Sequence, residues 1–476
     1  MNKSIRLGAM FSLLLTVVLL INLTVVQGLR EETYAQDGRN ARNFIELKQI
    51  NRGNINAGGT VLAQSHPDEN NFFQRAYPNM PFSFAPVVGY VSDQYGTSGL
   101  EAGFNSELTG QSGLTSRFTR TGAEKSTPGN TLELTIDPQL QALAYDELSN
   151  PGYAGAVVAM RPSTGAVLAM ASSPSFDPNT VANPRTAADA WANLTSNPGN
   201  PLLNHATQEQ LPPGSIFKII TTVAALRHGV TPDSPVTGQA SIILPGTETA
   251  LTNYGGQACG GGGSVTLRTA FAQSCNTAFV QTAIDLGAEP LRNAAAAFGV
   301  GENYDLGLPN AKGSLGQLPG AAELGQSAIG QRDVTMTALQ AAVMVSTVAN
   351  EGRRMAPYVV DKVIRPNLTP ERETRPRELN EALTPEEAGA LRELMLASER
   401  ATWGYNGNGF ASKTGTAEHG EGAAPHVWYV AFDPQKDVAV AVVVKNGGNL
   451  GQGATGGQVS APIGRTILNA APGGGI

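Results

Sequence analysis

The sequence predicts an α/β protein in which helices cover both faces of a central β-sheet, and helical segments separate its early strands from its late ones. Two strand candidates, residues 155–160 and 166–170, are apolar on both faces, as strands are when helices cover a sheet on each side. Three more strand candidates follow residue 409, and most of the chain between has helical periodicity. The early and late strands are therefore expected to share one sheet.

The composition limits the possible functions. A chain of 476 residues, 41% hydrophobic and 15% charged, can bury a large core, and its length predicts two or three domains. The formal net charge of -7 and the lack of a basic cluster in the sequence argue against a nucleic-acid partner. The five histidines and two cysteines do not have the spacing of metal ligands. We therefore expect no metal, no other cofactor and no nucleic-acid role.

An uncharged apolar run begins at Leu7, ends at Val26 and is long enough to cross a bilayer as one helix. Lys3 and Arg6 precede this run and two glutamates follow it, so the short N-terminus should stay in the cytoplasm. A cleaved signal peptide is the alternative interpretation. We expect a single-pass protein of the plasma membrane whose remaining chain is extracytoplasmic.

The chain divides into three expected parts: a cytoplasmic tip with the membrane anchor (residues 1–28), a small irregular module (29–125) and the main domain (126–476). Thr, Pro and Gly residues interrupt the pattern at the second boundary. Directly after it, residues 132–141 predict a strand that turns into a helix, with Asp137 as N-cap and Pro138 in the first turn.

The other elements of the main domain follow in chain order. The two early strands flank a turn at residues 162–165 and predict a hairpin. Helices are expected near residues 215–229, 266–274, 277–286, 335–349, 383–398 and 459–468, and late strands near 410–418, 427–432 and 438–445. The glycine-rich residues 255–263 lack the ending of a phosphate-binding loop and are interpreted as a connection.

A serine and a lysine stand one helical turn apart at the start of the helix near residue 215. Two prolines and Gly214 cannot continue this helix backwards, so it should begin at about Ser215. Residues i and i+3 share a helix face, so the Lys218 amine can reach the Ser215 hydroxyl. Apolar surroundings should lower the pKa of Lys218 and let it act as a base. By itself the pattern is weak, because an N-cap serine followed by a surface lysine is common.

Two further stretches strengthen this interpretation. Ser274-Cys275-Asn276 lies between two helical patterns, and a Lys-Thr-Gly-Thr stretch begins at Lys413. In penicillin-recognising enzymes, Ser-Asp-Asn and Lys-Thr-Gly motifs accompany Ser-X-X-Lys. Here the three motifs occur in that order, with Ser-Cys-Asn as the version of the second one. Together with residues 134–137 and 325–327, they make the chain from about Leu132 to Leu468 resemble the serine penicillin-recognising transpeptidases.

The small module also resembles part of a known family. Arg52-Gly-Asn-Ile55 and Gly99-Leu-Glu101 are similar to motifs in the N-terminal pedestal of class B penicillin-binding proteins, although Asn56-Ala57 replaces the Asp-Arg that often follows the first motif. No glycosyltransferase domain precedes the main domain, which is typical of the monofunctional class B. The short pedestal and the Ser-Cys-Asn motif are similar to those of actinobacterial members.

The resemblance implies a fold and an activity. The fold is the penicillin-binding transpeptidase fold, with a central antiparallel β-sheet flanked by helices, an all-helical subdomain and a non-catalytic pedestal. The activity is that of a D,D-transpeptidase, which cross-links peptidoglycan stem peptides ending in D-Ala-D-Ala and is a target of β-lactams. A serine β-lactamase or D,D-carboxypeptidase uses the same three motifs and is one alternative, and a penicillin-sensing receptor is another.

The motif residues receive expected catalytic roles. Ser215 attacks the substrate carbonyl and forms the acyl-enzyme, while Lys218 takes the serine proton. Ser274 passes a proton to the leaving nitrogen. Lys413 supplies positive charge that keeps Lys218 neutral and orients Ser274.

The remaining motif residues are expected to bind substrate. Asn276 can hydrogen-bond the substrate's backbone amide. Gly415 has no side chain, so the substrate can lie along this stretch as an added strand, with the hydroxyls of Thr414 and Thr416 on its terminal carboxylate. By resemblance, the backbone N–H groups of Ser215 and Thr416 form an oxyanion hole.

Two cysteines and one partner complete the expectations. Cys259 and Cys275 lie in a chain expected to be exported, where oxidation is permitted, so we expect a disulfide, with two buried free thiols as the alternative. The resemblance implies a membrane glycan polymerase of the SEDS type as partner of the pedestal. The alternative is that the pedestal only spaces the active site from the membrane.

Overall fold

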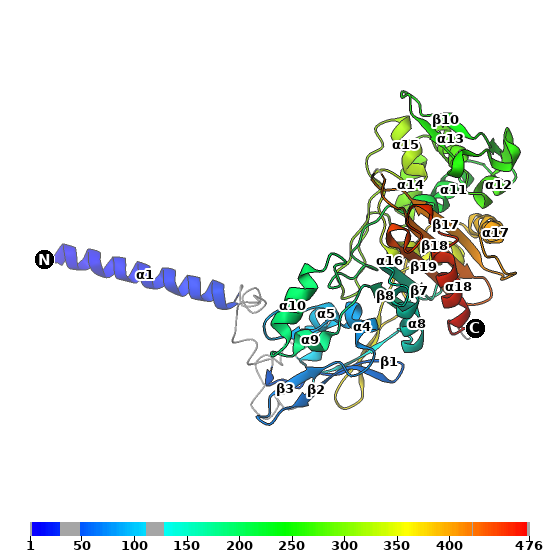
Figure 1. Cartoon of the computed structure of the whole chain (residues 1–476). Helices are drawn as coiled ribbons and strands as arrows, with labels where there is room; N and C mark the ends of the chain where they lie inside the picture. Colours follow the sequence, from blue (N-terminus) through cyan, green and yellow to red (C-terminus); the bar gives the residue numbers. More distant parts are fainter. Residues whose placement is uncertain (1, 29–47, 111–127, 421, 474–476) are drawn as a thin grey trace.

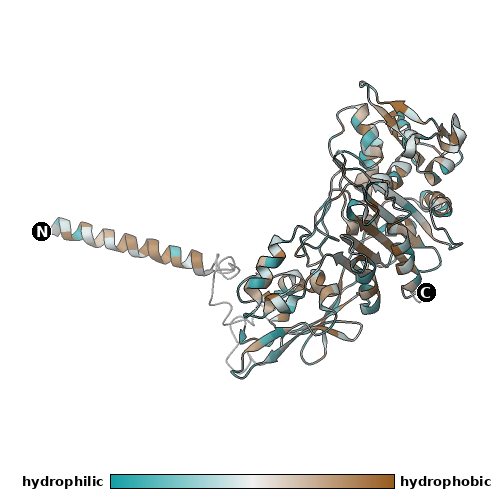
Figure 2. Ribbon diagram, viewed as in Figure 1, coloured by the Kyte–Doolittle hydropathy of each residue, from teal (hydrophilic) through white to brown (hydrophobic). Residues whose placement is uncertain are grey.

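The computed structural model describes residues 2–28, 48–110, 128–420 and 422–473. Helix α1 (Asn2–Gly28) extends away from a body formed by the other described segments (Figure 1). Its window Lys3–Val26 is the one part of the described chain long and apolar enough to cross a membrane, and none of it is buried. Most of α1 is hydrophobic, with hydrophilic residues at its N-terminal end (Figure 2).

The central sheet joins strands from both ends of the main domain. Its order is β17-β18-β19-β7-β8, and every neighbouring pair is antiparallel. The strands are β17 (Ala411–Ala417), β18 (His426–Asp433), β19 (Val438–Val444), β7 (Gly155–Met160) and β8 (Val167–Ser173). All residues of β7, β8 and β19 are buried, which matches their apolar sequences. The predicted sharing of one sheet by early and late strands is confirmed.

Helices cover both faces of this sheet. On one face, α16 (Ala338–Ala349) packs against β7, β18 and β19, and α11 (Lys218–Leu226) belongs to the same buried core as Trp428 and Val430. On the other face, α8 (Pro138–Ser149) and α18 (Ser460–Ala470) pack against Tyr429 and Val440. Asp137 caps α8 by accepting a hydrogen bond from the Leu140 N–H, as predicted.

The inserted helical region stands at the far end of the body from α1 (Figure 1). It contains α12 (Leu267–Ala272), α13 (Asn276–Leu286), α14 (Ala288–Ala297) and α15 (Ala321–Ala328). Two short strand pairs also occur here, β9 (Pro235–Thr237) with β12 (Ser264–Thr266), and β10 (Ser241–Ile243) with β11 (Ala250–Thr252). Strands of three residues are too short for the sequence pattern to have indicated them.

The remaining elements of the main domain complete the shell. Helix α17 (Pro385–Ala401) begins with a capping box formed by Thr384 and Glu387 and packs along β17. The others are α9 (Pro178–Ala182), α10 (Ala187–Ser196) and the paired strands β13 (Arg353–Met355) and β16 (Glu378–Glu381).

A second sheet combines segments that are far apart in the chain. Its order is β15-β14-β6-β1-β2-β3, formed by β15 (Pro370–Glu373), β14 (Val360–Ile364), β6 (Thr131–Leu134), β1 (Ile55–Ala57), β2 (Thr60–Pro67) and β3 (Phe73–Ala76). Helices α4 (Pro81–Val88), α5 (Gly99–Gly103) and α6 (Asn105–Leu108) and the strand pair β4 (Val91–Ser92) and β5 (Gly96–Thr97) belong to the same region. The sheet therefore takes strands from both sides of residue 126. The expected boundaries at 28/29 and 125/126 fall at segments outside the described residues, and the domain division stays a prediction.

The two pedestal motifs meet in a buried ion cluster. Arg52 donates from Nε and a terminal nitrogen to Glu101 Oε2, at 3.0 and 2.7 Å, and Arg75 pairs with Oε1. Glu101 is fully buried. Burial opposes ionisation of this carboxyl, but the charges of Arg75 and Arg52 outweigh burial, so the pKa of Glu101 lies below its usual value. Two motifs that are distant in sequence are thus joined by one buried salt-bridge cluster, which gives a physical reason for their arginine and their glutamate.

Replacing this carboxylate should destabilise the pedestal. We expect Glu101→Gln to lower the free energy of unfolding by about 3–5 kcal/mol, because two buried guanidinium groups lose their counter-charge. The measurement is urea unfolding followed by intrinsic fluorescence. A matched control is Glu289→Gln, which removes an exposed pair with Arg292 and should cost about 0.5 kcal/mol or less. Equal losses in the two variants would contradict the prediction.

Candidate active site

The nucleophile turn is a compact structure held on two sides. One turn of 3₁₀ helix, η2 (Gly214–Phe217), carries the half-buried Ser215 and leads directly into α11. The Gly214 N–H donates to Gly330 O at 2.9 Å, and Trp428 Nε1 donates to Pro212 O at 3.0 Å. A helical start at about Ser215 is thereby confirmed, and Trp428 on β18 fixes the residues just before it.

Two buried lysines converge on Ser274. Lys218 Nζ lies 2.7 Å from Ser274 O, 3.2 Å from Ser274 Oγ and 2.8 Å from Asn276 Oδ1. Lys413 Nζ, from β17, donates to the same hydroxyl at 2.9 Å and to Thr414 O at 3.1 Å. Both lysine side chains are fully buried. Among the described residues no hydrogen bond joins Ser215 to Lys218, so the amine faces the Ser-Cys-Asn turn.

Burial changes the titration of both lysines. Desolvation, and then the neighbouring charge of Lys413, holds the pKa of Lys218 well below its usual value. Desolvation also lowers the pKa of Lys413, to about 7. The sequence-based expectation of a lowered Lys218 pKa is thus met, and Lys413 carries its charge only below about pH 7.

These directions predict a bell-shaped pH dependence of β-lactam acylation. On the acid side the rate should fall as Lys218 gains a proton and can no longer act as base. On the alkaline side it should fall as pH rises through about 7, because Lys413 loses its positive charge. The second-order acylation constant, measured by intact mass against time at several pH values, checks this. Lys413→Arg keeps the charge and should remove the limb near pH 7, and an unchanged limb would contradict the assignment.

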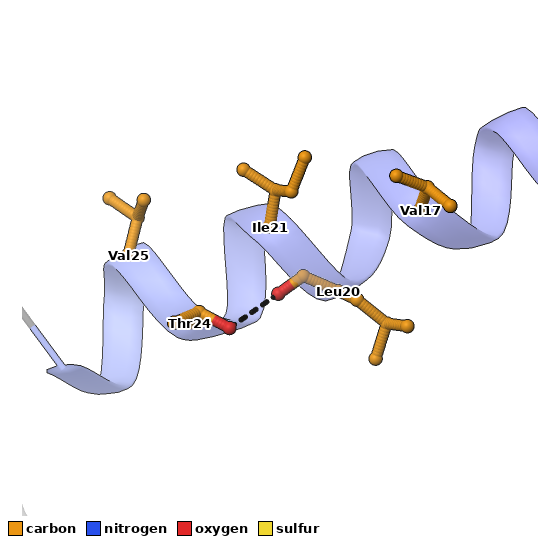
Figure 3. A pocket seen from close by; sticks show the side chains of 5 residues that line it. All are labelled: Val17, Leu20, Ile21, Thr24 and Val25. Atoms are coloured by element: carbon orange, nitrogen blue, oxygen red, sulfur yellow. Dashed lines mark hydrogen bonds between the residues drawn. The ribbon is translucent and has the colours of Figure 1, made fainter.

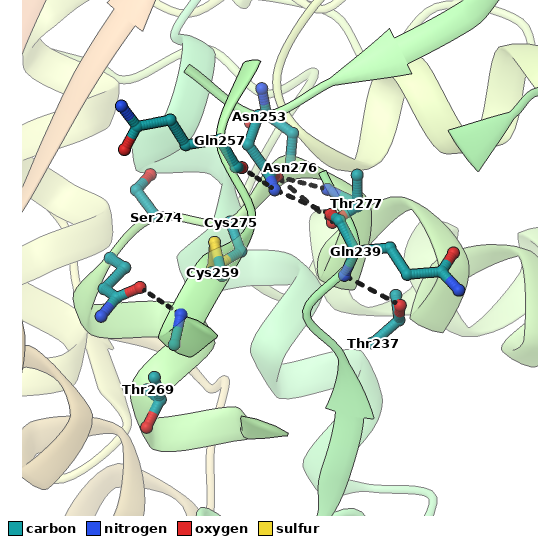
Figure 4. Close-up of a disulfide and its surroundings, with 12 residues drawn as sticks. Thr237, Gln239, Asn253, Gln257, Cys259, Thr269, Ser274, Cys275, Asn276 and Thr277 are labelled. Carbon is teal, nitrogen blue, oxygen red and sulfur yellow. Dashed lines mark hydrogen bonds between the residues drawn. A yellow bond between two sulfur atoms is a disulfide. The ribbon is translucent and has the colours of Figure 1, made fainter. Parts of the chain in front are cut away.

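The Ser-Cys-Asn turn has an unusual backbone and a covalent tie. Ser274 adopts a left-handed conformation (φ 56°), and Cys275 forms a disulfide with Cys259 (Figure 4). The expected disulfide is present. It anchors the glycine-rich loop to the turn, and in the chain-entropy model a ring of this size contributes about 3 kcal/mol. Asn276 Nδ2 also donates to Thr252 O, at 3.0 Å, which fixes the other side of the turn.

The Lys-Thr-Gly-Thr stretch lies in β17, an edge strand that pairs with β18 on one side only. Thr414 and Thr416 are half-buried. A side chain at Gly415 would come within 2.7 Å of Pro213 O and 3.1 Å of Ile216 Cγ2. The physical reason for this glycine is therefore close packing of β17 against the nucleophile turn. The expectation that Gly415 makes room for substrate is a separate matter and stays a prediction.

The structure brings all the expected motif residues to one place. A Cβ on Gly214 would lie 2.8 Å from Thr416 O, so the turn before Ser215 touches β17. Trp428 and Gly330 hold this arrangement and were not assigned a role from sequence. No local signal identifies Trp428, since its partner Pro212 is far away in the chain. The Gly330 contact likewise depends on tertiary packing.

Comparisons with known proteins agree with this geometry. The family model of the penicillin binding protein transpeptidase domain matches residues 155–469, and that of the penicillin binding protein A dimerisation domain matches residues 52–132. A protein named peptidoglycan D,D-transpeptidase PbpA from Mycolicibacterium smegmatis is 42% identical over 490 residues, covering 99% of each chain. Its namesake from Mycobacterium tuberculosis is 41% identical with the same coverage.

Solved structures give the same result. Penicillin-binding protein A from M. tuberculosis, as a ceftriaxone acyl-enzyme, has a TM-score of 0.85 and 41% identity over 90% of this chain and 99% of that chain. The penicillin G acyl-enzyme of the same protein has a TM-score of 0.82 and 41% identity, over 88% and 99%. In motifs, fold and overall sequence, the chain belongs to the penicillin-binding protein transpeptidases.

Proposed function

We propose that the chain is a membrane-anchored D,D-transpeptidase that cross-links peptidoglycan through an acyl-enzyme on Ser215. The observation that carries the proposal is the convergence of Lys218 and Lys413 on the Ser274 hydroxyl, beside the Ser215 turn and an open edge strand. Relatives that match over almost the whole chain bear the name peptidoglycan D,D-transpeptidase.

The first half of the reaction transfers the acyl group to the enzyme. Ser215 Oγ attacks the carbonyl carbon of the penultimate D-alanine, and its proton goes to Lys218. Lys218 can donate to Ser274 O and Asn276 Oδ1, and its third contact, to the Ser274 hydroxyl, can carry a proton in either direction. The C–N bond breaks, the leaving nitrogen receives a proton from Ser274, and the terminal D-alanine departs. An amine of a neighbouring stem peptide then attacks the ester carbonyl, the ester C–O bond breaks, and the proton that the amine loses returns to Ser215 Oγ.

The substrate would bind along the free edge of β17. Its backbone would pair with this strand, and its carboxylate would meet the hydroxyls of Thr414 and Thr416. Asn276 Nδ2 donates one hydrogen to Thr252 O, which leaves its second hydrogen for a substrate carbonyl. The backbone N–H groups of Ser215 and Thr416 would stabilise the oxyanion, each contributing about 2.7–4 kcal/mol to transition-state stabilisation.

The same site would react with β-lactams. The relatives from M. tuberculosis were solved as acyl-enzymes with ceftriaxone and penicillin G. With a β-lactam the broken C–N bond lies in the ring, so the leaving group stays attached and the second substrate cannot easily enter. Long-lived acylation would separate a transpeptidase from a β-lactamase.

The anchor and pedestal set the location of the reaction. The apolar face of α1 formed by Val17, Leu20, Ile21 and Val25 includes Thr24, whose hydroxyl bonds back to Leu20 O at 2.9 Å (Figure 3). The helix thus satisfies this polar group internally, as a bilayer requires. We propose that α1 spans the plasma membrane once, with residues 29–125 as pedestal and residues 126–476 as the extracytoplasmic catalytic domain. A SEDS-type glycan polymerase is the proposed partner.

Intact mass spectrometry of the full chain in detergent, mixed with benzylpenicillin, tests the function. We expect a stable adduct of one drug molecule, and cross-linking of a stem pentapeptide to an amine acceptor by the drug-free enzyme. Rapid drug turnover with no lasting adduct would support the hydrolase alternative. A lasting adduct with no activity on the pentapeptide would support the receptor alternative.

A further inference from the structure

A buried carboxylate lies directly behind the Lys-Thr-Gly-Thr strand. Glu399, near the end of α17, is fully buried. Its Oε1 accepts hydrogen bonds from Arg465 Nε at 2.7 Å and Asn408 Nδ2 at 3.0 Å. Its Oε2 accepts from Tyr429 OH at 3.0 Å and from Ser412 Oγ. Each oxygen has two donors, so the acceptor capacity of the carboxylate is filled.

Two of these donors flank the catalytic lysine. Ser412 immediately precedes Lys413 in β17, and Tyr429 pairs with Thr414 across the β17–β18 ladder. Side chains alternate along a strand, so Ser412 points to the face covered by α18 while Lys413 points to the face covered by α16. The carboxylate therefore joins Ser412, the residue before Lys413 in β17, to Tyr429 on the neighbouring strand β18, on the face to which Lys413 does not point.

The position of β17 in the sheet gives this contact its importance. An interior strand is held by neighbours on two sides, whereas β17 has only β18. Its other edge must stay open if a substrate strand is to pair with it. A hydrogen bond from Ser412 to the Glu399 carboxylate, made on one face of the sheet, can fix such a strand without blocking that edge.

We propose that Glu399 is a positioning residue for acylation, which fixes the edge strand β17 so that Lys413 reaches Ser274. The inference rests on the proposed function, since it concerns the same reaction. Glu399 does not touch the reacting atoms, and it acts through Ser412 and Tyr429. The 2.9 Å contact between Lys413 Nζ and Ser274 Oγ is the geometry that it maintains.

Glu399→Gln is the sharpest variant, because it keeps the shape of the side chain. Its amide oxygen can still accept from Arg465 and Asn408, and its NH₂ group can donate to the hydroxyls of Ser412 and Tyr429, which also act as acceptors. The two hydroxyl bonds then lose their charged acceptor. A misplacement of about 1 Å can cost about 100-fold in rate, so we expect the second-order acylation constant with benzylpenicillin to fall by at least about tenfold.

The matched control is Glu101→Gln in the pedestal. Both variants convert a fully buried, arginine-paired carboxylate to an amide, but Glu101 contacts no part of β17. Acylation is measured on the full-length proteins at a temperature well below the melting temperature of the less stable variant. The slow rate should appear in Glu399→Gln alone. Acylation of Glu399→Gln at the wild-type rate, or equal slowing in the two variants, would overturn the proposal.

A second readout separates positioning from stability. If β17 loosens, water reaches Lys413 and its pKa rises towards the usual value, so the alkaline limb of acylation should move above about pH 7. A purely structural role would leave this limb in place. If Glu399→Gln does not fold, Ser412→Ala is the substitute, because it removes only one of the four donors to the carboxylate. The same two measurements, the acylation constant and the position of its alkaline limb, then decide. Failure of the wild type to acylate at all would instead reject the proposed function.

Discussion

Replacing Ser215 with alanine should abolish the covalent benzylpenicillin adduct and the cross-linking of stem pentapeptides. Ser215 is the one residue to which the proposed reaction gives a covalent bond, so no other group can store the acyl intermediate. Losing a nucleophile of this kind lowers the turnover number by about 10⁶-fold. Intact mass after prolonged incubation gives a direct answer, because the adduct is either present or absent.

The variant should keep its fold. Ser215 is half-buried, and the turn that carries it is held by backbone contacts of Gly214 and Pro212, which the substitution leaves intact. A control is Ser163→Ala, which removes an exposed hydroxyl from the turn between β7 and β8 and should acylate normally. A persistent adduct on Ser215→Ala at a mapped second residue would reject the assignment of the nucleophile.

The sequence predicted the parts of this protein whose signals are local. Strands β7 and β19 of the central sheet are apolar along their whole length, and the capping residue Asp137 marks the start of its helix. The three motifs were found because each consists of neighbouring residues. The structure then brought Lys218 and Lys413 each within hydrogen-bond distance of the Ser274 hydroxyl, while the catalytic roles of these residues stay predictions.

Features that depend on distant pairing could not be predicted. Strand β14 joins the second sheet by pairing with β6, although more than half of the main domain separates them in sequence. From sequence, a lone glutamate such as Glu399 at the end of an amphipathic helix is expected to face solvent. Its burial depends on the packing of other elements around it, which the sequence does not reveal. The sequence also could not show why position 415 is a glycine, because its backbone packs closely against Pro213, which is far away in the chain.

Lys218→Met should be the second most damaging substitution. Methionine retains much of the apolar stem of the lysine but removes the amine, so no base takes the Ser215 proton and the hydroxyl attacks slowly. General-base catalysis typically contributes about 10²–10⁴-fold, and we expect acylation by benzylpenicillin to slow by that factor. The adduct should still form on Ser215 after long incubation, because the nucleophile and the oxyanion donors remain.

The pH profile of this variant distinguishes the roles of the two lysines. With the base removed, the acid limb of acylation should vanish, since that limb reports protonation of Lys218. The limb near pH 7 should stay in place, because burial, and not the Lys218 amine, lowers the pKa of Lys413 to about 7. Lys362→Met, the same substitution at a partly exposed lysine on strand β14 of the second sheet, should leave both limbs and the rate unchanged. An acid limb that survives in Lys218→Met would mean that another group takes the serine proton, with Lys413, the only other amine on Ser274 among the described residues, as the first to examine.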